Sequence, residues 1–238
     1  MNKFVYDSYE QMSYAAADVF ARQLAQKPDS VFGLATGSTP IGLYDELARR
    51  HGEGELDFSK AKSFNLDEYC PIKKTHQQSY HYFMNHYLFD KVNFAETHIP
   101  NGETDNPEQE CVDYDAKIKA AGGIDLQLLG IGINGHIGFN EPSSIYMMRM
   151  NMTELAQSTL EANSRFFGEG ESPPITALTL GFGAIFSAKK ILLLISGAGK
   201  AEIAKKLFED KIYTDIPASL LLLHPNVTVM MDKAAAGR

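Results

Sequence analysis

With 238 residues, 44% of them hydrophobic, the chain can bury the core of one large domain or two small ones, and this composition excludes a disordered or fibrous protein. Its formal net charge of −8 and its scattered Lys and Arg residues argue against a nucleic-acid partner, although a few N–H groups and one or two cations would still bind a phosphate group. The two cysteines, Cys70 and Cys111, form no metal or redox pattern, and the chain shows neither the apolar region of a signal peptide nor a membrane-spanning run, so we expect a cytoplasmic protein with free thiols.

Short apolar runs alternate with amphipathic stretches along nearly the whole chain. In chain order they predict a strand at 3–6, a helix at 8–27, a strand at 30–35, a helix at 38–50, a strand at 61–66, a helix at 76–92, strands at 124–132 and 190–197, a helix at 199–210 and a strand at 226–232. The alternation predicts a mostly parallel sheet with helices on both faces. No convincing linker interrupts it, so we expect residues 1–238 to form a single α/β domain.

The helix predicted at 38–50 is preceded by ATGSTP, residues 35–40. Thr39 is the expected N-cap of this helix, with Pro40 at its first position. Gly37 lets the backbone approach a ligand, while Ser38, Thr39 and the first helical N–H groups point outward at the positive end of the helix dipole. Such a turn can cradle a phosphate, but ordinary capped turns look alike, so the motif alone leaves both interpretations open.

The most specific polar motif is GINGHIGFNEP, residues 132–142, which follows the apolar run at 124–132. Its His136 and Glu141 are five residues apart in a loop tightened by Gly135 and Gly138, and Asn134 lies two residues before the histidine. A lone histidine is usually structural. A histidine beside a carboxylate that can orient it and tune its pKa is a candidate acid–base unit.

Other charged residues also follow predicted strands or lie among apolar residues. FNLDEY contains Asp67 and Glu68, SGAGK places Lys200 at the start of a helix, and ANSRFF contains Arg165. The alternative for each of these residues is an ordinary place in a solvated loop or a helix cap. A cation such as Lys200 at a helix N-terminus is unfavourable, however, unless an anion binds there. The ligand crevice of an open parallel sheet lies at the carboxyl ends of its strands, so we expect these loops to meet at one edge.

Taken together, these segments resemble the glucosamine-6-phosphate deaminase family, also called glucosamine-6-phosphate isomerases, over essentially the whole chain. The matching pieces, in order, are LATGSTPIGLY, FNLDEY, QSYHYFM, GINGHIGFNEP, ANSRFF, SGAGKA and ASLLLLHP. The resemblance implies a Rossmann-like α/β fold and an amino-sugar catabolic enzyme. The implied reaction converts glucosamine 6-phosphate and water to fructose 6-phosphate and ammonia, with neither a metal nor an organic cofactor.

The resemblance also implies roles for individual residues. Asp67 matches the base that takes the C2 proton and returns it at C1, His136 matches the acid–base group for ring opening, and Glu141 matches its partner. Asn134 stands where many members have Asp and others Asn, which would leave Glu141 alone to favour the protonated histidine. The positions that match phosphate-binding residues are Gly37, Ser38, Thr39, Arg165 and Lys200.

One stretch departs from the family pattern. Residues 143–155 read SSIYMMRMNMTEL, where the family usually has a segment rich in Ser and Thr. Asn151 and Thr153 occupy places that are basic in members activated by N-acetylglucosamine 6-phosphate, and the C-terminal extension of those members is missing, so we expect no such activation. The methionines of this stretch favour a flexible flap beside the active site, with a core contact as the alternative.

Three alternative functions stay open at this stage. The first is the same chemistry on galactosamine 6-phosphate. The second is 6-phosphogluconolactonase, which typically has Asp-Glu-Arg where this chain has Asp67-Glu68-Tyr69 and lacks FNEP. The third is a sugar-phosphate-sensing domain of a transcription regulator, in which we would expect an N-terminal DNA-binding module. For the enzyme that the resemblance implies, the expected partner is a small sugar phosphate, with no nucleic acid and no membrane, bound by a monomer or homo-oligomer.

Overall fold

The computed structural model describes residues 1–164, 167 and 171–238, and a parallel sheet runs through its centre. Within these residues the sheet has seven strands, and every neighbouring pair is parallel. Their order is β1 (Asn2–Tyr6), β10 (Val227–Asp232), β9 (Ile191–Ile195), β6 (Leu126–Leu129), β2 (Val31–Leu34), β3 (Lys62–Asn65) and β5 (Glu96–His98). The predicted mostly parallel sheet is therefore confirmed, and all six predicted strands belong to it.

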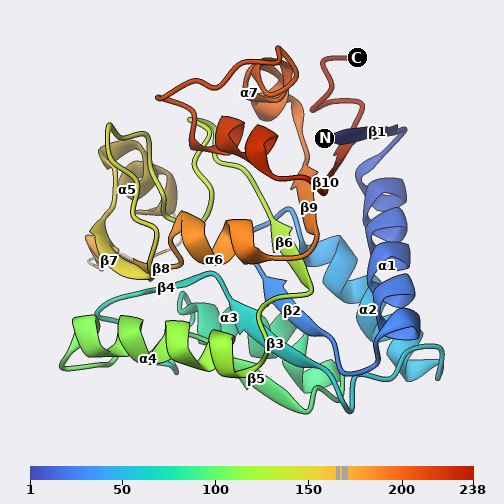
Figure 1. The fold of residues 1–238 in the computed structure, drawn as a ribbon, viewed down its shortest axis with the longest axis horizontal. Coiled ribbons are helices and arrows are strands. Elements are labelled where there is room, and N and C mark those ends of the chain that lie inside the picture. The colour runs from blue at the N-terminus through green and yellow to red at the C-terminus, as the bar shows by residue number, and fades with distance from the viewer. Residues whose placement is uncertain (165–166, 168–170) are drawn as a thin grey trace.

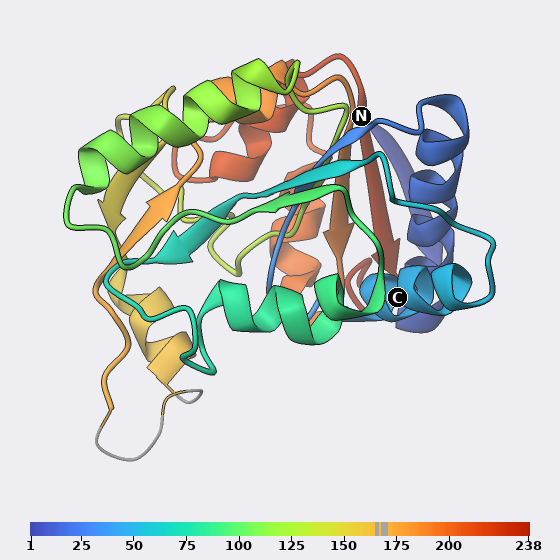
Figure 2. The ribbon, with the colours of Figure 1, turned by 90° about the horizontal axis from the view of Figure 1, so that it is seen from below.

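Helices cover both faces of this sheet. Figures 1 and 2 show α4 (Pro107–Ala120) and α6 (Phe182–Ser187) on one side, with α2 (Ile41–Gly52) and α3 (Tyr80–Tyr87) on the other. The central strands β6 and β9 are buried at every residue, as their continuous apolar runs predict. The predicted Rossmann-like α/β arrangement is therefore confirmed.

The remaining helices complete these layers. They are α1 (Tyr9–Gln26), α5 (Gln157–Ser164) and α7 (Ala201–Lys206), together with the 3₁₀ helices η1 (Phe89–Lys91), η2 (Ala198–Lys200) and η3 (Pro217–Leu223). The predicted helix at 8–27 matches α1, which begins after Ser8, whose side chain accepts the N–H of Gln11. The prediction at 76–92 covers α3 and η1, and that at 199–210 covers α7.

A second, antiparallel sheet was not predicted. Its strands are β4 (Asp67–Tyr69), β8 (Thr176–Thr179) and β7 (Asn151–Glu154), in that order. Leu66 joins the two sheets, because its N–H donates to Leu34 O of β2 at 3.0 Å while its carbonyl accepts the N–H of Leu180 at 2.8 Å. The chain thus passes from one sheet to the other within a single residue, immediately before Asp67.

The N-terminus of α2 differs from the prediction. The helix begins at Ile41, Pro40 is its N-cap in helical conformation, and no side chain caps it, so the assignment of Thr39 as N-cap is wrong. The hydroxyl of Tyr9, from α1, instead accepts the N–H of Gly42 at 2.7 Å. A distant side chain therefore satisfies one of the free N–H groups that a cap would satisfy.

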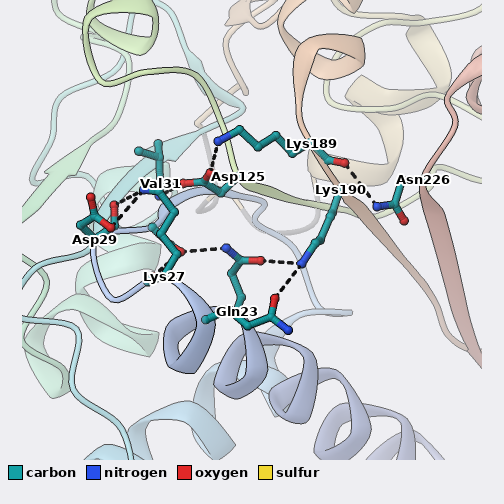
Figure 3. Close-up of polar contacts among 10 residues, drawn as sticks. Gln23, Lys27, Asp29, Val31, Asp125, Lys189, Lys190 and Asn226 are labelled. Atoms are coloured by element: carbon teal, nitrogen blue, oxygen red, sulfur yellow. Dashed lines mark hydrogen bonds and ion pairs between the residues drawn. The ribbon is translucent and has the colours of Figure 1, made fainter.

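At the opposite edge of the sheet, a buried carboxylate ties several strands together (Figure 3). Asp125, 3% exposed, lies just before β6 and accepts the N–H of Val31 at 2.8 Å. It also pairs with Lys189 Nζ at 2.6 Å, just before β9, and with Lys27 Nζ at 3.1 Å, at the end of α1. Burial opposes ionisation, but Lys189, the N–H of Val31 and Lys27 outweigh it and hold the pKa of Asp125 below its ordinary value.

We expect Asp125→Ala to destabilise the protein by about 1–3 kcal/mol, because the buried N–H of Val31 loses its partner. Since the folded pKa of Asp125 is lowered, its contribution is present above the unfolded pKa and is lost as the pH falls through the folded value. Urea unfolding at pH 7 and at pH 3 measures both effects. The control is Asp29→Ala, which removes an exposed partner of Lys27 and should change stability by less than about 0.5 kcal/mol. Equal losses for the two variants at pH 7 would contradict the assignment.

Candidate active site

A cavity of about 780 Å³ opens at the carboxyl ends of the parallel strands. Its walls come from the segments after β2, β3 and β6, from η2 after β9, and from α3. Among the predicted site residues, those that line it are Gly37, Ser38, Thr39, Asp67, Asn134, His136 and Lys200. Glu141 lies behind His136, and Arg165 falls outside the described residues.

The loop before α2 forms one end of the cavity. Gly37 has a φ of +98°, a left-handed conformation that favours glycine and turns the chain so that Gly37 and Ser38 are exposed. The Tyr9 hydroxyl holds this loop from outside, because it lies 3.2 Å from Ser38 O and 3.1 Å from Thr39 O while it accepts the N–H of Gly42. Sequence reasoning missed Tyr9, since one tyrosine in an amphipathic helix carries no signal of such a role.

Lys200 supplies a cation near this loop. Its Nζ donates to Ile131 O at 2.7 Å, and burial lowers the pKa of its ammonium group. No carboxylate among the described residues forms an ion pair with it. A half-buried ammonium group at the start of a helix, without a negative partner, suits an anionic ligand such as a phosphate.

The side chains of His136 and Glu141, the candidate acid–base unit of the motif, lie beside each other. The Nδ1 atom of His136 lies 3.3 Å from Glu141 Oε2, which also accepts the Asn134 side-chain amide at 2.7 Å. The other oxygen, Oε1, accepts the hydroxyl of Thr159 from α5. Burial opposes ionisation of Glu141, but His136, Thr159 and Asn134 outweigh it, and the pKa of Glu141 is lowered. The carboxylate is therefore held in its charged form beside the imidazole.

Gly132 and Thr159 make this geometry possible. A Cβ at Gly132 would lie 2.3 Å from Cε1 of His136, so only glycine leaves room for the ring. The role of Thr159 was not predicted, because it lies 18 residues from Glu141 in the sequence and outside any motif. Only the folded chain brings α5 beside the loop of His136.

Asp67 is the first residue of β4 and is 5% exposed. A Cβ at Gly138 would lie 3.2 Å from Asp67 Oδ2, so the loop that carries His136 passes closely over this carboxyl group. Burial, followed by the negative charge of Glu68, raises the pKa of Asp67 to about 8. A carboxyl group with a pKa near neutrality, inside a cavity, is matched to the work of a general base.

The segment 143–155 does not form the predicted flap. None of its residues is among those that line the cavity within the described chain. Met147 O and Met148 O accept the N–H groups of Phe182 and Gly183, and a Cβ at Gly181 would lie 2.5 Å from Met147 O, so the segment is tightly docked on α6. Met150 is 5% exposed and belongs to the core, as the alternative prediction has it, whereas Met147 and Met148 are exposed and do not.

The cavity thus combines N–H donors and a cation with two separate acid–base groups, which suits proton transfer on a phosphorylated substrate. The chain belongs to the family of glucosamine-6-phosphate isomerases and 6-phosphogluconolactonases, whose family model matches residues 7–230. It is 50% identical to a glucosamine-6-phosphate deaminase of Clostridium perfringens over 238 residues, covering 99% of this chain and 98% of the relative. It is 49% identical to that of Thermoanaerobacter pseudethanolicus, covering 96% and 91%.

Solved structures agree with this assignment. A monomeric glucosamine-6-phosphate deaminase superposes with a TM-score of 0.96 at 44% identity, covering 100% of this chain and 99% of that one. The 6-phosphogluconolactonase from Trypanosoma cruzi has a TM-score of 0.81 at 18% identity, covering 100% and 96%, and shares the fold. Among the described residues no helix is long and apolar enough to cross a membrane, and no group of three or more His, Cys, Asp or Glu side chains could hold a metal ion.

We expect Asp67→Asn to stabilise the fold, increasingly so at high pH. The raised pKa of Asp67 means that the folded protein keeps a proton that the unfolded chain has released, so stability falls as the pH rises from about 4 to about 8. Asparagine removes this penalty. The Tm gain at pH 9 should exceed that at pH 5 by at least about 2–4 °C, the shift that 1 kcal/mol causes in a chain of this size. The exposed Asp105→Asn serves as control, and a gain independent of pH would argue against a buried, proton-holding Asp67.

Proposed function

We propose that this protein converts glucosamine 6-phosphate and water to fructose 6-phosphate and ammonia, as an enzyme of amino-sugar catabolism. The observation that carries the proposal is the meeting of Asp67 and the His136–Glu141 pair in one cavity with the loop of Gly37 and the ammonium group of Lys200. The names of the relatives at about 50% identity support the same substrate. Ring opening and transfer of a proton between C1 and C2 need acid–base groups of this kind.

In this proposal the phosphate group lies against the N–H groups of Gly37, Ser38 and Thr39, with Lys200 supplying positive charge. Binding there fixes one end of the sugar, so that its reacting carbons are presented to the acid–base groups. Tyr9 contributes without contacting the substrate, because its hydroxyl fixes the carbonyls of the loop and the first turn of α2. Arg165 is proposed as a second cation for the phosphate.

The chemical steps divide between the two acid–base groups. His136, oriented by Glu141, moves the proton needed to open the pyranose ring, and the amide of Asn134 holds Glu141 in place. Asp67, in its ionised form, then takes the proton from C2 and returns it to C1, while a proton from the amine nitrogen passes to the C1 oxygen, so that the product is the C2 imine of the ketose. Addition of water to this imine with loss of ammonia gives fructose 6-phosphate and completes the balance.

Two related activities are less well supported. The solved 6-phosphogluconolactonases are about 20% identical, so their likeness shows the fold alone, whereas the FNEP element is built into this site: Asn140 donates to Ile137 O at 3.0 Å and to Leu180 O at 2.9 Å, next to Glu141. Galactosamine 6-phosphate would use the same groups, and the assay below separates the two sugars.

The similarity to a monomeric deaminase favours a monomer, and we propose a cytoplasmic location, in keeping with a phosphorylated intracellular substrate.

We expect the purified protein to release ammonia and ketose phosphate in equal amounts from glucosamine 6-phosphate. Galactosamine 6-phosphate should react at least about tenfold more slowly in kcat/KM, because a misplaced hydroxyl leaves polar groups unpaired. Unphosphorylated glucosamine should react poorly, since it lacks the group that the loop of Gly37 binds. Hydrolysis of 6-phosphogluconolactone without ammonia release from either amino sugar would reject the proposal.

We expect Tyr9→Phe to raise the KM for glucosamine 6-phosphate about 5- to 20-fold while changing kcat less than about twofold, because hydrogen bonds worth about 0.5–1.5 kcal/mol each are lost at the loop and not at the reacting atoms. Steady-state kinetics across the substrate range measure both constants. The control is Tyr14→Phe on the same helix, at an exposed tyrosine whose ring packs on Arg50 and is retained. If Tyr9→Phe lowers kcat with KM unchanged, the loop-holding role is wrong.

A further inference from the structure

Glu68, the neighbour of Asp67, is buried and points into the start of α3. It is 1% exposed, and its carboxylate accepts three backbone N–H groups, from Tyr69 at 3.0 Å, Tyr80 at 2.8 Å and His81 at 3.0 Å. The first donor belongs to β4 itself and the other two to the first turn of α3. One side chain therefore joins the strand that carries Asp67 to the helix that forms a wall of the cavity.

Among the described residues, the segment around Gly102 covers one side of Glu68. A Cβ at Gly102 would lie 3.2 Å from Glu68 Cγ and 2.3 Å from Tyr69 O, so the backbone near Gly102 packs directly against the aliphatic part of the Glu68 side chain. Ser79 is the N-cap of α3 and accepts the N–H of Tyr82 at 3.0 Å, so the helix already has a cap of its own. Glu68 accepts the first two N–H groups of α3, which the Ser79 cap leaves free, and it does so from the strand of Asp67.

We propose that Glu68 is a positioning residue that acts on the reaction through Asp67. It fixes the strand end of Asp67 against the N-terminus of α3 and places a second negative charge beside that buried carboxyl group. This inference rests on the proposed function, since it needs Asp67 to be the base. Tyr80, Tyr82 and Phe83, from the helix that Glu68 holds, line the cavity, so the same contact also sets the distance between Asp67 and this wall.

The charge of Glu68 has a definite effect on its neighbour. Among the described residues, the groups that interact electrostatically with Asp67 are Glu68 and Tyr69 on β4, Tyr80 on α3 and Tyr114 on α4, while His136 and Lys200 share its cavity. The three phenols are neutral at physiological pH because burial raises the pKa of each. Glu68 is the acidic group among these neighbours, so removing its charge should lower the pKa of Asp67.

The test compares the pH dependence of kcat/KM for the wild type, Glu68→Gln and Ser79→Ala with glucosamine 6-phosphate. The wild-type rate should rise with pH through about 8 as Asp67 ionises beside Glu68, whose own pKa burial raises to about 7. In Glu68→Gln this rising limb of the pH profile should move to lower pH by roughly one unit, the size of shift that a neighbouring charge produces. Ser79→Ala removes the cap of the same helix and leaves the charge of Glu68 in place, so its limb should stay at the wild-type position.

A shorter, still charged side chain separates the two parts of the role. Glu68→Asp should keep the wild-type limb but lose roughly 10- to 100-fold in kcat, because a displacement of about 1 Å at the reacting groups costs that much. Inhibition by inorganic phosphate should be unchanged, since the substitution does not touch the loop of Gly37, where we propose that phosphate binds. Circular dichroism shows whether Glu68→Gln folds. If it does not, Glu68→Asp still tests the inference, because a wild-type kcat in that variant would overturn it. So would a Glu68→Gln limb at the wild-type pH, or an equal shift in Ser79→Ala, whereas an inactive wild type would instead reject the proposed function.

Discussion

The site depends on the position of Asp67 in the chain. Asp67 directly follows Leu66, the residue whose backbone is hydrogen-bonded to both sheets. Leu66 pairs with β2 on one side and with the residue after β8 on the other, so the next side chain enters the space between the two sheets and becomes buried. Thr179 of β8 pairs with Asp67, and its hydroxyl accepts the N–H of Phe139. The small sheet thus carries Asp67 and also holds the loop of His136 against it.

The pKa values of two carboxyl groups at this site, Asp67 in the cavity and Glu141 behind His136, are shifted in opposite directions by their surroundings. Burial and the adjacent negative charge of Glu68 raise the pKa of Asp67 to about 8. Glu141 is also largely buried, but it receives Asn134 and Thr159 and lies beside His136, and its pKa is lowered. Opposite shifts of this kind allow one group to exchange a proton near neutral pH while the other stays charged and orients a base. The division of labour in the proposed reaction follows from it.

Patterns of apolar residues predict the part of the fold that those residues build. The runs at 124–132 and 190–197 predict β6 and β9, because a strand buried on both faces has no polar positions. The small sheet escapes prediction because β4 reads DEY and β7 alternates between half-buried and exposed residues, so neither shows an apolar run. Likewise α4 buries only Cys111, Tyr114 and Ile118, too few for a clear helical stripe. Motifs identify Asp67, His136 and Lys200, while Tyr9, Thr159 and Glu68 act through contacts that only the folded chain creates.

The two edges of the parallel sheet have different physical tasks. At the amino ends, Asp125 draws Val31, Lys27 and Lys189 together, and its lowered pKa means that the charged form stabilises the fold (Figure 3). At the carboxyl ends, burial disfavours the charged forms of Asp67 and Lys200, so the groups best suited to act on a substrate reduce the stability of the folded state. Strand β2 spans both edges, with the N–H of Val31 bound to Asp125 and the loop of Gly37 beyond its other end. The same short strands run from one edge to the other. The ion pairs at their amino ends therefore hold in register the strands whose carboxyl ends keep Asp67 and Lys200 close together.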